Sequence, residues 1–417
     1  MTTRDPRYND AIDLLQALAQ GGYASRLAGG CVRDRLLGIE PGDFDVASVA
    51  TPEQVTELLQ KRWKVVPTGI EHGTVTVVMK HGPVEVTTLR IDVTTDGRRA
   101  EVAFSDSFEE DASRRDFTVN AMFEDASGKI YDYHGGQGDL KAKALCFVGD
   151  AKARIEEDYL RILRLFRFWS KLGFVPDHET LVVVAEQASQ LHLISQERKT
   201  SEMWKLFCAD HPYPALRSMY DTGVLQHVLP GTGIQEPRED VQDALKKLDS
   251  SLRPIAWLLW LLGIAEGDDA NDSSLPEMAR TLRISNEETR QLLGWSAQWG
   301  ALANPYDARE DQMDFVDRVE AAGGSLSDFV LSFSVAQSAK NTGRQENLRA
   351  IERTEAVHGH LRRRQMPVNG SDVATWLGIS PGPAIGGHLT ALKQAFRRGE
   401  WAEKGEAKVW LMSHKDS

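Results

Sequence analysis

The sequence predicts an α+β fold in which a mixed helix-and-strand domain precedes a long all-helical part. Two observations carry this prediction. Residues 63–66, 73–80 and 84–90 have the pattern of short strands broken by glycines. Beyond residue 150 the strand signals thin out, and helical periodicity dominates to the C-terminus. We therefore expect the mixed domain to extend to about residue 145.

Composition narrows the class of protein. At 417 residues the chain should hold two to four domains, and its net charge of −12 argues against a protein that coats nucleic acid indiscriminately, although a local basic groove stays open. The three cysteines lie far apart, which excludes a disulfide framework and the usual zinc spacings. The longest apolar run, at 255–264, is too short to span a membrane, and the N-terminus lacks the apolar core of a signal peptide. A cytoplasmic protein is expected.

Two amphipathic helices are expected in the first sixty residues. The first covers residues 8–21, and the second begins at Thr51-Pro52-Glu53, which has a capping pattern. Four apolar side chains should mark the buried face of the first helix: Ile12, Leu15 and Leu18, with Leu14 near its edge.

Residues 27–48 lie between these helices and carry a candidate nucleotide and metal site. Gly29 and Gly30 open a turn before a short helix, and such a turn lets backbone amides approach phosphates. Asp43 and Asp45 flank one apolar residue on a short strand, so both carboxylates should lie on one face. Two neighbouring carboxylates repel each other unless a divalent cation neutralises them, and Mg²⁺ with substrate phosphates fits best. A solvated turn is the alternative for the Asp-x-Asp pair.

The strands that follow add a third acidic candidate. Glu85 lies on a strand between apolar neighbours, and is either a solvated outward-facing residue or a third carboxylate beside Asp43 and Asp45. Residues 92–111 are polar and acidic with little periodicity, which predicts a flexible connection or lid.

Next come a candidate phosphate clamp and a turn-rich passage. Arg114, Arg115 and Asp116 precede an apolar helix start, so the arginines are either solvated surface residues or bidentate phosphate ligands. Residues 132–140 are rich in glycine, and form either a hinge that ends the first domain or an ordinary loop.

A single helix over residues 156–169 is the second chemical feature. Asp158 and Arg161 are three positions apart, which places them one turn apart on one face; Arg164 continues that face and Arg167 has drifted round the helix. A salt-bridged amphipathic helix is the structural alternative. Cytosine and adenine each pair an amino donor with a ring-nitrogen acceptor, so a carboxylate beside a guanidinium matches both and mismatches uracil and guanine. The pair is a candidate protein-made template.

The rest of the chain offers less chemistry. Residues 197–202 open a helix with a structural role, and residues 211–340 have the pattern of a helical body. Beyond about residue 357, a basic run precedes two expected helices joined by a Gly/Pro turn, which is a candidate unit for binding an RNA backbone.

Taken together, these motifs resemble those of the class II CCA-adding enzymes, the tRNA nucleotidyltransferases that share a catalytic core with bacterial poly(A) polymerases. The resemblance covers nearly the whole chain and is densest over residues 27–168. It implies a nucleotide and metal motif at Gly29, Gly30, Arg33, Asp43 and Asp45. It implies further nucleotide-contacting residues at Arg114, Arg115, Asp116, Asn120, Asp158, Arg161, Arg164 and Arg167, and Glu85 joins the catalytic candidates.

The resemblance also implies an architecture and a reaction. A polymerase-β-like head (1–145) is expected before a templating neck (146–210), a body (211–340) and a tRNA-binding tail (341–417). The implied reaction is Mg²⁺-dependent addition of CCA to the 3′ end of tRNA from CTP and ATP, with contacts to the acceptor and elbow regions. Residues 92–111 resemble the flexible loop that the family needs for the final A, which disfavours a C-only enzyme.

Three alternatives remain. An enzyme that adds only the terminal A shares these motifs. Poly(A) polymerases usually have a basic C-terminal extension and a basic strand where this chain has H-G-T-V-T-V. A non-catalytic RNA-binding protein would have no need of the carboxylates Asp43 and Asp45.

Overall fold

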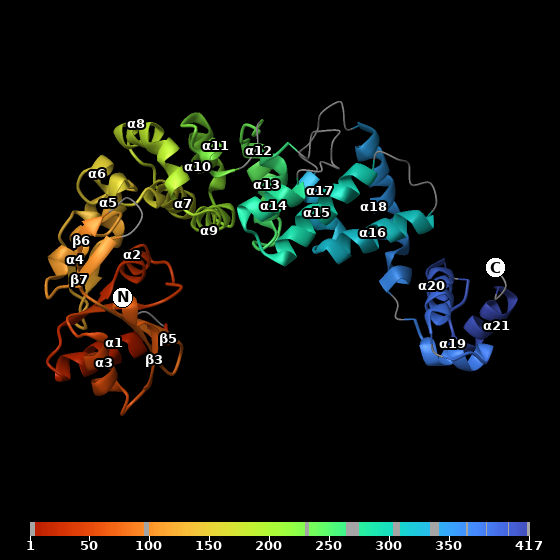
Figure 1. The fold of residues 1–417 in the computed structure, drawn as a ribbon, viewed down its shortest axis with the longest axis horizontal. Coiled ribbons are helices and arrows are strands. Elements are labelled where there is room, and N and C mark those ends of the chain that lie inside the picture. The colour runs from red at the N-terminus through yellow and green to blue at the C-terminus, as the bar shows by residue number, and fades with distance from the viewer. Residues whose placement is uncertain are drawn as a thin grey trace. The chain divides into compact units, whose positions relative to one another are not determined.

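The computed structural model describes residues 5–95, 100–229, 233–263, 275–302, 309–333, 342–363, 366–380, 382–398 and 400–414. The chain divides into two compact units. The first comprises Met1–Thr232 with Glu236–Glu239, and the second comprises Gly233–Gln235 with Asp240–Ser417. Strands occur in the first unit, and the described part of the second is helical (Figure 1). This confirms the predicted α+β class, whereas the four-part division stays a prediction.

A seven-stranded mixed sheet organises the first unit. Its order is β3-β4-β5-β2-β1-β8-β9; β2 pairs with β5 in parallel, and the other neighbours are antiparallel. Buried valines alternate with more exposed residues along β4 and β5, as expected for strands with one face on a core. The strands are β1 (Ser25–Ala28), β2 (Asp45–Ser48), β3 (Lys64–Gly69), β4 (Thr74–Val78), β5 (Pro83–Thr88), β8 (Met122–Glu124) and β9 (Ile130–Asp132).

Short helices surround this sheet: α1 (Pro6–Gln20), α2 (Gly30–Leu36), α3 (Pro52–Leu59), α4 (Phe108–Ser113) and α5 (Gly136–Ala142), with 3₁₀ turns η1 (Ile70–His72) and η2 (Thr118–Asn120). Helix α3 packs on β3, β4 and β5, and Thr51 caps it through the expected box. The expected face of α1 is slightly wrong. Leu14 is fully buried and Ile12 only half-buried, because Ala11 joins Leu14, Leu15 and Leu18 at helical spacing.

The segment expected to be an irregular connection is instead ordered secondary structure. Strands β6 (Arg90–Thr95) and β7 (Ala100–Phe104) form a separate antiparallel pair, and α4 follows. The prediction of irregular structure was wrong because the polar and acidic composition masked the alternation of apolar and polar residues in β6, and β7 has no clear alternation of its own. Residues 96–99 lie outside the described part, and the proposed role as a lid stays a prediction.

The turn-rich passage after β9 also contains a helix. Asp132 accepts hydrogen bonds from the backbone N–H groups of Gly136 and Gln137, both at 2.9 Å, and so caps α5. A Cβ atom on Gly136 would lie 2.3 Å from the Thr118 carbonyl oxygen, which explains the glycine. An ordinary glycine loop is therefore wrong for residues 136–142, and the hinge role stays a prediction.

The remainder of the first unit is helical, with one break that matters for the site. Its elements are α6 (Ala151–Glu157), α7 (Leu160–Leu172), α8 (His178–Gln187), η3 (Ala188–Leu193), α9 (Gln196–Phe207), α10 (Pro212–Asp221) and α11 (Val224–Val228). Asp158 has extended backbone angles (φ −154°, ψ 104°) and separates α6 from α7. The single helix expected over residues 156–169 is therefore two helices.

The second unit is a series of helices around tryptophan-rich cores. They are α12 (Glu239–Leu245), α13 (Arg253–Leu261), α14 (Leu275–Leu282), α15 (Asn286–Ala301), α16 (Arg309–Ala322), α17 (Leu326–Phe333), α18 (Thr342–Arg363), α19 (Gly370–Leu377), α20 (Pro383–Arg398) and α21 (Lys404–His414). Four tryptophans of α13 and α15 are fully buried: Trp257, Trp260, Trp295 and Trp299. A large apolar core thus explains a segment in which the sequence offered no chemistry.

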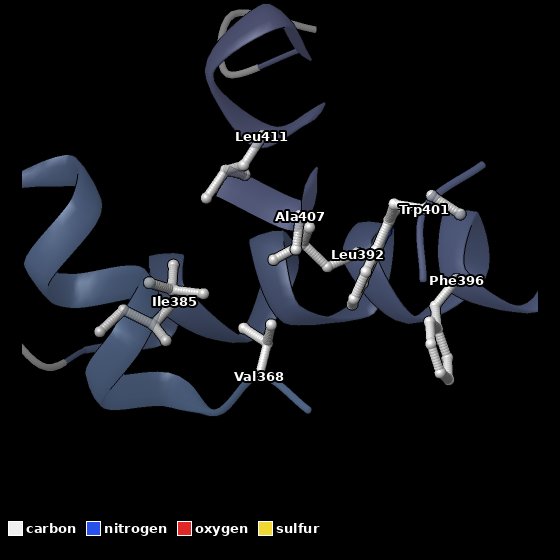
Figure 2. Close-up of a cluster of buried hydrophobic side chains, with 9 residues drawn as sticks. Val368, Ile385, Leu392, Phe396, Trp401, Ala407 and Leu411 are labelled. Carbon is white, nitrogen blue, oxygen red and sulfur yellow. The ribbon is translucent and has the colours of Figure 1, made fainter. Parts of the chain in front are cut away.

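The last three helices share a core of their own. Buried side chains of α19, α20 and α21 meet around Leu392, Phe396 and Trp401 (Figure 2). The rings of Phe396 and Trp401 lie 4.7 Å apart between centroids. The expected pair of helices joined by a Gly/Pro turn is confirmed as α19 and α20, with α21 packed against both.

The composition led to predictions about the three cysteines and about membrane-spanning segments. Cys31, Cys146 and Cys208 form no disulfide, and burial raises the pKa of the Cys31 thiol to about 12. Among the described residues, no helix is long and apolar enough to cross a membrane.

Candidate functional site

A polar cavity of about 900 Å³ lies in the first unit, where the ends of β1, β2 and β5 meet α2, α7 and the C-terminal end of α4. Every candidate from the sequence lines it: Gly29, Gly30, Arg33, Asp43, Asp45, Glu85, Arg114, Arg115, Asp116, Asn120, Asp158, Arg161, Arg164 and Arg167. Basic lining residues outnumber acidic ones nine to seven, although the whole chain has 61 acidic and 49 basic residues. The acidic chain therefore contains a locally basic cavity.

Three carboxylates gather where β2 and β5 line this cavity. Phe44 is buried between Asp43 and Asp45, so their side chains alternate with it, and the parallel register places Asp45 directly opposite Glu85. Burial, followed by the charges of Asp43 and Glu85, raises the pKa of Asp45 to about 6. The alternative in which Glu85 is merely solvated is half right: Glu85 is exposed, but it faces the cavity beside Asp45.

These carboxylates fit a divalent cation. Their mutual repulsion is what a cation would relieve, and the charge of Arg115 offsets it in part at Asp45. Within the described ranges, no three His, Cys, Asp or Glu side chains are close enough to hold an ion alone. Mg²⁺ usually takes one or two protein carboxylates and completes its shell with water and substrate phosphates.

Gly29, at the junction of β1 and α2, also lines the cavity. It adopts φ 73° and ψ −122° before α2, and a Cβ atom there would lie 2.8 Å from the Nη1 atom of Arg115. The backbone N–H of Gly29 donates to the Met122 carbonyl oxygen at 3.0 Å. The N–H of Gly29 is therefore engaged within the protein, and the missing Cβ leaves space for Arg115. The expected approach of backbone amides to a phosphate at this turn stays a prediction.

The expected phosphate clamp is held from behind by one buried acid. Asp111 accepts from Arg114 Nε through one oxygen and from Arg115 Nη2 through the other, each at 2.9 Å. Burial opposes ionisation of Asp111, but the two guanidiniums keep its pKa below its usual value. Since Asp111 is 1% exposed and both arginines line the cavity, the pair is positioned with donors left for an anion.

A second network joins four further candidates. Arg33 Nη1 donates to Asn120 Oδ1 at 2.5 Å, Asn120 Nδ2 donates to Asp116 Oδ1 at 3.4 Å, and Arg164 Nε donates to Asp116 Oδ2 at 2.7 Å. Burial opposes the charge on Asp116, yet Arg164 keeps its pKa below its usual value. Asp116 is therefore a buried anchor for Arg164 and Asn120.

The expectation that Asp158 and Arg161 lie on one face of a single helix is wrong. Asp158 Oδ2 accepts from Arg198 Nη2 at 2.8 Å, while Arg161 pairs with Glu157 and donates to the Arg154 carbonyl oxygen at 2.7 Å. The physical reason is the break between α6 and α7. It takes Asp158 out of helical geometry, and leaves Glu157 four positions before Arg161 as the nearer carboxylate. Both Asp158 and Arg161 nevertheless line the cavity.

Two residues at this site were missed by the sequence analysis. Asp111 precedes its partners Arg114 and Arg115 by three and four positions, so helical spacing was an available signal. Arg198 lies forty positions from Asp158, and only the packing of α9 on α7 brings it there. Glu202 pairs with Arg167 at 2.5 Å, which agrees with the structural role expected for residues 197–202.

Comparisons with known proteins agree with this geometry. Residues 25–146 match the family described as the poly A polymerase head domain, and residues 173–233 match the probable RNA and SrmB-binding site of polymerase A. The mouse mitochondrial CCA tRNA nucleotidyltransferase 1 is 36% identical over 94% of this chain and 87% of its own length. This chain belongs to the CCA tRNA nucleotidyltransferase family. The resemblance inferred from the motifs is confirmed.

Bacterial members of the CCA tRNA nucleotidyltransferase family are similar over as much of the chain. The CCA-adding enzyme of Geobacillus sp. (strain WCH70) is 31% identical over 94% of this chain and 93% of its own length. In the crystal structure of the Bacillus stearothermophilus CCA-adding enzyme in complex with CTP, the protein has 29% sequence identity to this chain. The two folds match with a TM-score of 0.72 over 99% of this chain and 98% of that one. A Thermotoga maritima CCA-adding enzyme complexed with tRNA, 19% identical with a TM-score of 0.66, shares the fold.

Proposed function

We propose that this chain completes the 3′ end of tRNA by adding C, C and A from CTP and ATP, with release of pyrophosphate. The observation that best supports the proposal is the single cavity that combines a carboxylate trio with clustered arginines in a member of this family. In each step the 3′-hydroxyl oxygen of the tRNA bonds to the α-phosphorus, and the bond to the pyrophosphate oxygen breaks. A protein that only binds RNA would not carry out this reaction.

Asp43 and Asp45 are the proposed Mg²⁺ ligands, with Glu85 beside them. When bound, Mg²⁺ would supply positive charge to the attacking hydroxyl oxygen and the leaving pyrophosphate. Arg114 and Arg115, held by Asp111, are positioned to bind phosphate oxygens. These residues orient the triphosphate and stabilise its charge.

Asp158 and Arg161 are the proposed selectors of the base. Their separate partners, Arg198 and Glu157, hold the carboxylate and the guanidinium on the cavity wall. An acceptor from Asp158 and a donor from Arg161 would match the edges of cytosine and adenine, but would leave charges unsatisfied against uracil and guanine. Selection would then need no nucleic-acid template.

The tRNA body is proposed to bind beyond this cavity. The tail, residues 341–417, is the candidate for contact with the elbow, and its three-helix core gives it a defined surface. The cytoplasmic location expected from composition stays a proposal, since the mouse relative is named as mitochondrial and bacterial relatives are equally similar in extent.

The test uses tRNA transcripts that end at the discriminator base, at added C, or at added CC. Each is incubated with Mg²⁺ and CTP, ATP or both, and the product length is read on a sequencing gel. Growth by C, C and A that then stops supports the proposal. Extension of the CC-ended transcript alone, by one A, would instead identify an A-adding enzyme. A long A ladder would identify a poly(A) polymerase, and no extension a binding protein.

A further inference from the structure

The C-terminal end of α4 is held by two arginines that come from the α6–α7 segment. The last carbonyl groups of a helix have no partner within it, and a cation near them is favourable. Arg154 Nη2 donates to the carbonyl of Ser113 and reaches that of Arg115 at 3.5 Å, and Arg161 Nη2 donates to the carbonyl of Arg114 at 3.1 Å. Two guanidiniums thus bind three successive carbonyls.

One carboxylate joins these two arginines. Arg154 Nη1 donates to Glu157 Oε1 at 2.6 Å, and the guanidinium of Arg161 binds Glu157 Oε2. Burial opposes ionisation of Glu157, but the two guanidiniums keep its pKa below its usual value, so the triad stays charged. Arg161 is consequently oriented by Glu157, which Arg154 holds in place.

Arg154 cannot act on the nucleotide by direct contact in this geometry. It is 8% exposed, and neither Arg154 nor Glu157 lines the 900 Å³ cavity, whereas Arg114, Arg115 and Arg161 do. Arg161 has five N–H donors, and its three protein hydrogen bonds leave two that can meet a substrate. The direction of these two donors depends on the triad.

We infer that Arg154 is a positioning residue that sets nucleotide selectivity, because it ties the loop that carries the phosphate-contacting arginines to the arginine that selects the base. The inference rests on the proposed function. It predicts that the triphosphate and the base edge can shift relative to each other when the contacts of the Arg154 guanidinium are lost. The kcat/KM values for UTP and GTP should then rise relative to those for CTP and ATP.

The test compares Arg154→Met and Arg154→Lys with the wild-type chain. On CC-ended and discriminator-ended tRNA, kcat and KM are measured separately for CTP, ATP, UTP and GTP. We expect Arg154→Met to lower the ratio of kcat/KM for CTP over UTP by about tenfold or more. Arg154→Lys should fall between, because an ammonium lacks the planar fork that binds Glu157 and the Ser113 carbonyl together.

Lys152→Met is the matched control, since Lys152 is exposed on the same helix. It should leave the ratio of kcat/KM for CTP over UTP and the melting temperature unchanged. A double-mutant cycle of Arg154→Met with Glu157→Gln should be strongly non-additive, because both act through Arg161. If Arg154→Met does not fold, the ratio for Arg154→Lys and the single Glu157→Gln variant decide the question.

The outcomes separate the inference from the function on which it rests. A wild-type chain that fails to add C, C and A overturns the proposed function. A wild-type chain that adds them, with variants that slow all four nucleotides by the same factor, overturns the inference and leaves Arg154 a structural residue. A selective loss restored in part by lysine supports the positioning role.

Discussion

Charged side chains around the cavity differ in whether a partner neutralises them. Asp111, Asp116 and Glu157 are each bound by arginines, which keep their pKa values below the usual range despite burial. Asp45 is the exception, because burial and the acidic neighbours Asp43 and Glu85 raise its pKa, and Arg115 offsets this only in part. Paired acids position arginines, whereas the raised pKa of Asp45 supports its proposed role as a cation ligand.

Asp45→Asn should therefore stabilise the metal-free protein while abolishing transfer. The pKa of Asp45 is raised to about 6 in the folded chain, so its ionised form destabilises the fold above that pH. The gain should be at most about 3 kcal/mol at pH 8 and should vanish below about pH 4, where the carboxyl is protonated in both states. Thermal melts with EDTA across this pH range measure it.

The exposed Asp13 of α1 provides the control, since Asp13→Asn should leave the melting temperature unchanged at every pH. Addition of Mg²⁺ with CTP should stabilise the wild type and not Asp45→Asn. A variant that melts no higher than wild type at pH 8 would contradict the view that Asp45 is uncompensated.

Asp158→Ala should alter which nucleotides the chain incorporates. Loss of the carboxylate removes the acceptor for the amino groups of cytosine and adenine, so either discrimination against UTP and GTP falls or incorporation of C and A is lost. Relative incorporation rates for all four nucleotides measure this. Arg217→Ala, on the surface of α10, is the control and should change none of them. Unchanged relative rates in Asp158→Ala would refute the template role.

At the scale of elements, the site depends on where helices and strands stop. The break at Asp158 separates the carboxylate from Arg161, and the parallel pairing of β2 with β5 brings Glu85 to Asp45. Helix α4 ends where its carbonyls meet Arg154 and Arg161. Element ends therefore supply Asp45, Asp158 and Arg161, whereas Glu85, Arg164 and Arg167 come from the interiors of β5 and α7.

Gly29→Ala tests the junction between β1 and α2. The φ of 73° with ψ of −122° is strained for alanine, at about 1–3 kcal/mol, and the added Cβ would displace Arg115. We expect a lower melting temperature and a rise in KM for both CTP and ATP, because a phosphate ligand has moved. Steady-state kinetics on CC-ended and discriminator-ended tRNA measure the effect.

Gly38→Ala separates strain from displacement. Gly38 also has φ 73°, but a Cβ atom there meets nothing within 4 Å. It should lower the melting temperature without changing either KM. Equal kinetic effects in the two variants would contradict the claim that Gly29 makes room for Arg115.

At the scale of the whole molecule, the last three helices, α19, α20 and α21, share a core of their own within the proposed tail. Phe396 is 2% exposed and packs against Trp401, so Phe396→Ala should cost about 3–5 kcal/mol and unfold these helices first. The Kd for tRNA should rise, while the affinity for CTP in the absence of tRNA stays the same. Filter binding and calorimetry measure the two constants.

The control for the tail is Val409→Ala on α21, where the side chain is 70% exposed. It should leave melting and CTP binding unchanged. Unchanged tRNA affinity in a Phe396→Ala chain whose tail has unfolded would remove the tail from the tRNA-binding surface.

The sequence by itself determined the fold class, the family and the chemical type of each candidate. Period-two and helical patterns mark the strands and most helices, and the motifs around Asp43, Arg115 and Arg161 are contiguous in the chain. Such local signals depend only on neighbouring residues, and every candidate they named lines one cavity.

Only the tertiary structure decided how these residues are paired. Arg198 reaches Asp158 from another helix, Glu85 reaches Asp45 through strand register, and Arg154 reaches the end of α4 across forty-one positions. No local pattern encodes such distances, because packing and register depend on the whole chain. The hairpin of β6 and β7 was missed for the same reason: its alternation is weak, and pairing between the strands stabilises it.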